Sequence, residues 1–378
     1  MDFGISEEQK DIQNLARQLF SDLATAESLA PSDEAAAERF DPALWNQLAE
    51  AGLLGVGIDE AHGGMGFGFM EVAMLVEELG RTIAAAPLIS HLVSAALPVQ
   101  AFGSDDQKAR YLPDAVTGKT MLTAALMEDL NEDPTQPARC SVSADGDGFV
   151  LSGSKRCVPF ARRAEAVLLA AKSEQGVVVL LVDPNQQGVT LTDLAVTQFE
   201  PQCDMDFDQV KIESSQVLVG PENGAEAMRW ITERTCAALC AHQLGVTDVM
   251  MRMTASYTSE RKQFGVPVAT FQAVGHRAAN CFIDIECLRL NAYQAASMLG
   301  EGHDASNEVA IAKIWAGDVG HRVSYASQHM HGGTGIDRDY PLWRFCLAAR
   351  HNEMMLGSSA YQLARLGRNI AAGEAYCR

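Results

Sequence analysis

The chain has 378 residues, 47% of them hydrophobic, which is enough for about two or three domains with cores of their own. Its 49 acidic residues outnumber its 29 basic residues, so the formal net charge is −20. Such an acidic chain is a poor partner for nucleic acid or an anionic membrane, because both are negatively charged. No apolar run in the sequence is long enough to span a bilayer.

The nine cysteines favour a reducing compartment. Their number is odd and no C-x-x-C pair occurs, so we expect free thiols. Cys236 and Cys240 are four residues apart, but no His/Cys pair nearby completes a metal site. The first residues lack a basic region followed by an apolar run, which speaks against a signal peptide. These features predict a cytoplasmic protein without a bound metal.

The first part of the chain, residues 1–118, has helical patterns. Ser6 and Gln9 form a capping-box signature, followed by apolar residues at helical spacing. Asp41 followed by Pro42 predicts the start of another helix. Later helices are predicted over residues 69–80, 89–102 and 108–117. We therefore predict an N-terminal α-helical domain.

The pattern changes over residues 119–222. Short apolar or alternating runs between turns are typical of strands, and the stretch from Asp145 to Gly148, Asp-Gly-Asp-Gly, predicts a hairpin turn. An antiparallel β-domain or barrel of about 100 residues is a reasonable domain size. We predict a middle β-domain with these bounds.

The last part, residues 223–378, has four long helical patterns joined by short turns. They cover residues 225–258, 272–299, 306–331 and 341–373. This arrangement predicts a four-helix bundle. The predicted fold class is therefore α+β, mostly α, with two helical regions flanking a β-domain.

Two loops interrupt the helices of this last part. One runs from Ser259 to Gln272, where Gly265 and Pro267 stop the incoming helix and Arg261 lies near its end. The other runs from Gln328 to Ile336, and its glycines allow close backbone approach. A polar turn with an arginine in water explains the first loop alone. The two loops together suit a phosphate-bearing cofactor.

These loops resemble those of the acyl-CoA dehydrogenases, whose C-terminal domain carries an Arg-Lys-x-Phe-Gly turn, a Phe-Gln pair and a His/Phe-Gly-Gly-x-Gly loop. The resemblance covers nearly the whole chain and implies FAD as cofactor, an acyl-CoA substrate and the three-domain fold of that family. Members bind FAD at a subunit interface, and many have glutamine where this chain has His329. By resemblance, the residues that hold the ADP part of FAD are Arg261, Phe264, Gln272, His329, Gly332 and Gly333.

The family's catalytic base is absent from both positions where members carry it. That glutamate removes the α-proton of the thioester, which must lie beside the carboxylate. Counting from Tyr340 and Pro341 places Leu356 at the usual position, and counting back from Arg261 places Thr235 at the alternative one. Neither side chain can accept the proton, so we assign no catalytic residue.

Two carboxylates lie near these base positions. Glu353 precedes Leu356 by three residues, about 4.5 Å along an expected continuous helix. Glu233 precedes Thr235 by two residues. We expect both to be solvated helix carboxylates.

The stretches that match the family's flavin cradle also differ. Residues 126–134 contain no glycine and four acidic residues, which suits neither an electron-rich flavin nor phosphate. Residues 153–159 lack the tryptophan and threonine that lie beside the flavin in the family.

The resemblance is closest to the non-catalytic partner subunits of bacterial α2β2 dehydrogenases that act on steroid side-chain CoA thioesters. It implies a glutamate-bearing partner subunit in a heterotetramer, and an electron-transfer flavoprotein as acceptor. Two alternatives stay open. The chain could be a self-sufficient dehydrogenase with Glu353 or Glu233 as base, or a flavin-free acyl-CoA-binding or structural protein on this fold.

Overall fold

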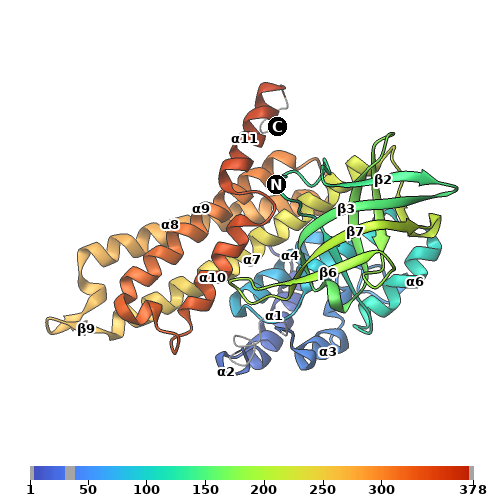
Figure 1. Ribbon diagram of the computed structural model, residues 1–378. Helices are drawn as coiled ribbons and strands as arrows, with labels where there is room; N and C mark the ends of the chain where they lie inside the picture. Colours follow the sequence, from blue (N-terminus) through green and yellow to red (C-terminus); the bar gives the residue numbers. More distant parts are fainter. Residues whose placement is uncertain (1–3, 30–38, 374–378) are drawn as a thin grey trace. The chain divides into compact units, whose positions relative to one another are not determined.

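The computed structural model describes residues 4–29 and 39–373 (Figure 1). The chain divides into two compact units. One unit comprises Met1–Ala26, Ala73–Ala84 and Cys236–Arg378, and the other comprises Glu27–Val72 and Ala85–Thr235. The boundaries of the three predicted domains stay a prediction.

The helices of the first part begin largely where the sequence signals place them. Ser6 and Gln9 form the predicted capping box, and Asp41 caps the helix that begins at Pro42. The range predicted over residues 89–102 is a π-helix followed by an α-helix. The elements are α1 (Glu7–Leu23), α2 (Ala26–Leu29), α3 (Pro42–Glu50), α4 (Phe69–Thr82), η5 (Ile89–Ala96), α5 (Leu97–Phe102) and α6 (Asp105–Val116).

The middle of the chain forms a sheet of eight strands in the order β6-β7-β3-β2-β4-β5-β8, with β1 paired to β4. Asp145 pairs with Gly148 across the predicted two-residue turn between β2 and β3. The sheet is not wholly antiparallel, because β1 and β2 run parallel to β4. The strands are β1 (Met121–Ala125), β2 (Cys140–Asp145), β3 (Gly148–Pro159), β4 (Ala164–Lys172), β5 (Val177–Val182), β6 (Val189–Leu194), β7 (Gln202–Ile212) and β8 (Val217–Val219).

The last part forms the predicted bundle with one correction. The fourth helix, expected over residues 341–373, is broken into two, because Leu356 and Gly357 adopt positive φ of 53° and 92°. In the bundle, α9 packs against α8, α10 and α11 (Figure 1). The elements are α7 (Gly224–Glu260), β9 (Lys262–Gln263), β10 (Val266–Pro267), α8 (Gln272–Gly300), α9 (Ser306–His331), η9 (Gly332–Ile336), α10 (Leu342–Met354) and α11 (Ser359–Ala371).

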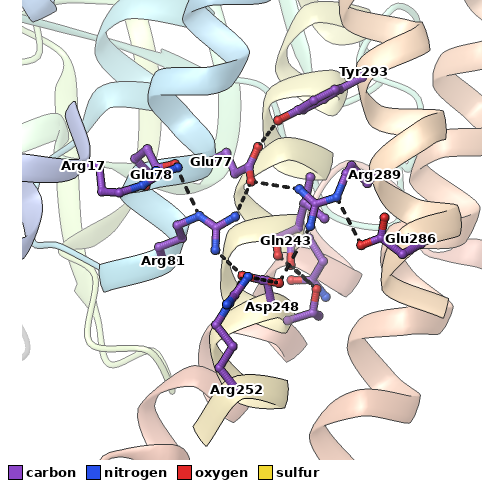
Figure 2. Close-up of polar contacts among 12 residues, drawn as sticks. Arg17, Glu77, Glu78, Arg81, Gln243, Asp248, Arg252, Glu286, Arg289 and Tyr293 are labelled. Carbon is purple, nitrogen blue, oxygen red and sulfur yellow. Dashed lines mark hydrogen bonds and ion pairs between the residues drawn. The ribbon is translucent and has the colours of Figure 1, made fainter. Parts of the chain in front are cut away.

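A buried network of charged side chains ties α4 to α7 and α8 (Figure 2). Arg81 on α4 contacts Glu77 at 2.7 Å and also Asp248 on α7. The carboxylate of Glu77 accepts hydrogen bonds from Tyr293 and Arg289 of α8 at 2.6 and 3.4 Å. Since Glu77 is fully buried, these donors and cations are what make its charge tolerable.

His91 connects η5 to β1 and α6, within the unit that comprises Glu27–Val72 and Ala85–Thr235. Its imidazole is fully buried, and Nδ1 accepts the N–H of Leu122 in β1 at 3.0 Å. Nε2 lies 3.2 Å from the carbonyl oxygen of Ala115 in α6 and must donate to it, since that oxygen can only accept. Both ring nitrogens are thus used by the neutral imidazole, and burial lowers the pKa of His91 to about 4.

Stability is expected to fall on acidification because of this histidine. The pKa of His91 in the folded chain lies below its unfolded value, so its contribution is complete above about pH 6.5 and is lost towards about pH 4. Between about pH 7 and 5.5, the free energy of unfolding should fall by about 1 kcal/mol from this group. Urea unfolding of wild type and His91→Gln at the two pH values measures it. Equal pH dependence in both proteins would contradict the assignment.

Candidate functional site

The predicted arginine turn is a tight hairpin at the end of α7. The backbone N–H of Arg261 donates to Tyr257 O at 2.8 Å, and its carbonyl accepts the N–H of Val268 at 2.8 Å. Phe264 and Gly265 between β9 and β10 have φ of 54° and 83°, the backbone of a type I′ turn. The side chain of Arg261 is exposed, and within the described residues its guanidinium forms no ion pair. It is therefore available to an anionic ligand.

The predicted glycine loop follows α9. Gly332 has φ of 62° and ψ of −137°, a backbone conformation that residues other than glycine rarely adopt. A Cβ built at Gly332 or Gly333 would meet no atom within 4 Å. The backbone here is thus open to a ligand, in contrast to Gly335, where a Cβ would lie 2.6 Å from Gln328 O.

The remaining predicted contacts lie on the hairpin and on the neighbouring helix ends. Gln272 is the first residue of α8 and Phe264 is 95% exposed, with its ring 6.3 Å from that of Phe271. His329 lies near the end of α9, where Nδ1 is hydrogen-bonded to Arg277 of α8. Arg277 is a second cation in this region that the sequence motifs did not reveal, because it lies within a helix and outside both loops.

Leu356 lies at the break between α10 and α11. Its side chain is only 3% exposed and its carbonyl accepts a hydrogen bond from Gln362 Nε2 at 3.0 Å. A left-handed backbone costs a non-glycine residue about 1–2 kcal/mol, so its surroundings must hold it there. No ionisable group occupies this position.

Lys313 fixes the α10 end of this break. Its fully buried ammonium donates to the carbonyl oxygens of Asn352 and Glu353 at 2.8 and 3.2 Å. These carbonyls belong to the last turn of α10, where a cation is favoured by the helix dipole. The side chain of Asn352 is itself bound to Gln243 Oε1 at 2.8 Å. The turn that contains Leu356 is therefore rigidly supported.

Thr235, the alternative base position, is a packed helix hydroxyl. It is 5% exposed and donates to Ile231 O at 2.8 Å. Its oxygen lies 3.0 Å from that of Ser94 in η5. The side chain thus serves local packing, and a neutral hydroxyl is too weak a base to take the α-proton of a thioester.

The two nearby carboxylates differ in environment. The carboxylate of Glu353 contacts Arg350 and lies 3.5 Å from His321 Nδ1, so it is engaged in a surface ion pair. Because α10 ends at Met354, the expected helical offset between Glu353 and Leu356 does not apply. Glu233 is only 7% exposed, so the prediction that it is solvated is wrong.

The loop that matches the flavin cradle is organised around Glu128. Its Oε2 accepts the backbone N–H groups of Ala138 and Arg139 at 2.6 and 2.9 Å, and Oε1 accepts Lys155 Nζ at 2.8 Å. Glu128 and Lys155 are 6% and 2% exposed, and these contacts hold the pKa of Glu128 below its usual value despite burial. The carboxylate therefore occupies N–H groups that an external ligand would need.

The neighbouring strands are acidic. Arg156 on β3 contacts Asp129 at 2.9 Å and Asp206 at 3.1 Å. Cys157, which follows it at φ of 52°, donates its N–H to Asp204 Oδ1 at 3.1 Å. Arg156 is thus paired with the chain's own carboxylates, so these strands offer little attraction for an electron-rich ring or a phosphate.

Neither a membrane-spanning helix nor a metal-binding cluster occurs in the described residues. No helix within residues 4–29 and 39–373 has the length and hydropathy to cross a membrane. Across the same ranges no cluster of His, Cys, Asp and Glu could hold a metal ion. Eight of the nine cysteines lie in these ranges, and all eight are free.

A helical region before the sheet in the chain, a second helical region after it and these two loops define the acyl-CoA dehydrogenase class of fold. The models of the N-terminal, middle and C-terminal acyl-CoA dehydrogenase domains match residues 6–119, 129–210 and 222–371. The chain belongs to the acyl-CoA dehydrogenase family. Members of this family are FAD-dependent oxidoreductases.

Several relatives match over almost their whole length. Acyl-CoA dehydrogenase FadE27 of Mycobacterium tuberculosis is 35% identical over 98% of this chain and 99% of its own. A chain of the ChsE4-ChsE5 complex from the same species is 34% identical with a TM-score of 0.93 and full coverage of both chains. A chain of a variant Tcur3481-Tcur3483 steroid ACAD is 38% identical, with a TM-score of 0.91 and coverage of 98% and 99%.

Proposed function

We propose that this chain is the non-catalytic subunit of a heteromeric acyl-CoA dehydrogenase. It would complete the FAD site of a different subunit that carries the catalytic glutamate. The observation that carries the proposal is Leu356, a buried hydrocarbon side chain in a rigid turn at the position where the family has its base. The partner's glutamate would take the α-proton of the thioester.

The two halves of the candidate flavin site differ in how well they suit the cofactor. At the nucleotide half, Arg261 offers an unengaged cation and Gly332 and Gly333 offer open backbone, which suits a diphosphate. At the cradle, Glu128 takes the N–H groups of its own loop. We therefore assign only Arg261, Phe264, Gln272, His329, Gly332 and Gly333 to FAD, which when bound accepts the hydride of the dehydrogenation.

Several large apolar or aromatic side chains are exposed on the hairpin, α8, α9 and η9, and we call them the exposed apolar set. An exposed set of this kind suits contact with another protein. A glutamate-bearing subunit of the same family is the partner we propose for it. Its members and their exposed fractions are Phe264 (95%), Phe282 (60%), Ile283 (58%), Tyr325 (65%) and Ile336 (71%).

The relatives support the choice of partner and substrate. One of the solved structures is named as the ChsE4-ChsE5 complex, and another carries the two names Tcur3481-Tcur3483 and is named as a steroid ACAD. We propose a heterotetramer acting on a bulky acyl-CoA thioester of the steroid side-chain type, with an electron-transfer flavoprotein as acceptor. The free cysteines are in keeping with a cytoplasmic location.

Purification of the chain alone and with a glutamate-bearing partner tests the proposal. We expect a colourless, inactive chain by itself, and a yellow complex that reduces a dye with an acyl-CoA substrate after co-expression. A yellow, active homomer would overturn the proposal and favour Glu353 or Glu233 as base. A chain that acquires no flavin in any complex would favour the flavin-free binding or structural role.

A further inference from the structure

The arginine turn and the glycine loop come from helices far apart in the sequence, and an aromatic contact joins them. Tyr257 lies in the last turn of α7, and its ring stacks on the imidazole of His331 at 4.4 Å and 25°. Its hydroxyl oxygen lies 3.3 Å from Thr334 Oγ1 within the glycine loop. The backbone carbonyl of Tyr257 also accepts the N–H of Arg261. Tyr257 therefore contacts both loops.

His331 and Tyr340 close the glycine segment at its two ends. His331 Nδ1 lies 2.7 Å from Ser327 O and must donate to it, which leaves Nε2 to accept the hydroxyl of Tyr340 at 3.1 Å. The rings of His331 and Tyr340 are 5.1 Å apart. Burial lowers the pKa of His331, which keeps this neutral arrangement in place at neutral pH.

We infer that Tyr257, stacked on the His331–Tyr340 pair, is a positioning residue that holds the arginine turn and the glycine loop at the spacing a diphosphate needs. This inference rests on the proposed function, because it names what organises the nucleotide half-site. None of the three side chains is assigned a contact with FAD. Their role is to restrict two exposed loops before the ligand binds, which reduces the entropic cost of binding.

One consequence can be tested in the chain without flavin: the local stabilities of the two loops should be coupled. In the isolated chain, Tyr257→Ala is expected to speed amide hydrogen exchange about threefold to tenfold in residues 262–270 and also in residues 332–340, since one contact restrains both. Tyr293→Ala is the matched control, because that half-buried tyrosine donates to Glu77 in the charged network. It should leave both segments unchanged.

A purely structural role predicts a different pattern. Acceleration confined to the hairpin beside Tyr257, or equal acceleration by Tyr293→Ala, would overturn the inference. Tyr257→Leu, which retains a large apolar side chain, replaces the alanine variant if that chain does not fold. Tyr257→Phe keeps the stack and loses only the Thr334 contact, so its effect should be smaller than that of alanine.

Flavin affinity in the complex separates the inference from the function on which it rests. Tyr257→Ala should weaken FAD retention about tenfold, while Tyr293→Ala should not change it. If Arg261→Ala releases FAD and Tyr257→Ala does not, the positioning role is wrong and the half-site stands. If neither variant affects FAD, the proposed function itself fails, and the exchange experiment still decides whether Tyr257 couples the loops.

Discussion

Replacing Arg81 by methionine is expected to lower the free energy of unfolding by about 3–5 kcal/mol, the usual cost of removing one partner from a buried ion pair. Arg81 lies between Glu77, Glu78 and Asp248, and its side chain is 16% exposed (Figure 2). Burial alone would lower the pKa of Arg81, but these carboxylates hold it above its ordinary value. Without the guanidinium, their negative charges remain buried with fewer cations. Urea unfolding of the two proteins measures the difference.

Arg252→Met is the matched control for this variant. Arg252 contacts the same carboxylate, Asp248, at 2.7 Å, but its side chain is 74% exposed. Exposed pairs contribute about 0–1 kcal/mol, so the control should fall in that range. Equal losses from Arg81→Met and Arg252→Met would show that the network is not the restraint on α4 that its burial implies.

Helix starts and hairpins were predictable because their signals are local. The capping box of Ser6 and Gln9 and the turn before Gly148 depend only on residues within a few positions of each other. The parallel pairing of β1 with β4 has no such signal. It depends on where two strands separated by β2 and β3 meet in the sheet.

Gly80 shows why a glycine in the sequence can mislead. The sequence predicts a helix over residues 69–80, with this glycine as its last residue, but α4 continues to Thr82. A Cβ at Gly80 would overlap the backbone of His242, and one at Gly245 would overlap that of Glu77. These glycines allow α4 and α7 to cross in backbone contact. The sequence pattern does not distinguish a stop from a close approach.

The break at Leu356 could not be predicted for a related reason. Leucine is a good helix former, and nothing in the local sequence requires it to adopt positive φ. The support comes from Lys313 on α9 and from Gln362 on α11, six residues after Leu356. The candidate site residues are predictions from motifs, whereas the stack of Tyr257 on His331 required the structure.

Replacing Arg261 by alanine is expected to weaken FAD binding in the complex about 10- to 100-fold, because hydrogen bonds to a charged partner contribute about 1.5–3 kcal/mol. The chain carries a net charge of −20, so a phosphate is repelled at long range and needs a local cation. Arg261 is exposed at the hairpin beside the open glycine loop. The complex is incubated at several FAD concentrations and passed through a gel-filtration column. The absorbance of the flavin retained by the protein at each concentration gives the dissociation constant.

Lys262→Ala is the control that separates a specific contact from general electrostatic attraction. Lys262 is adjacent to Arg261 and is also exposed. Its substitution by alanine removes the same positive charge. If the arginine contributes only general electrostatic attraction, both variants should lose the same FAD affinity. That affinity should also depend strongly on salt, because exposed charges are screened. A bidentate contact by a planar guanidinium would make Arg261→Ala much the weaker, and Arg261→Lys would recover only part of the affinity, since an ammonium keeps the charge but not the fork.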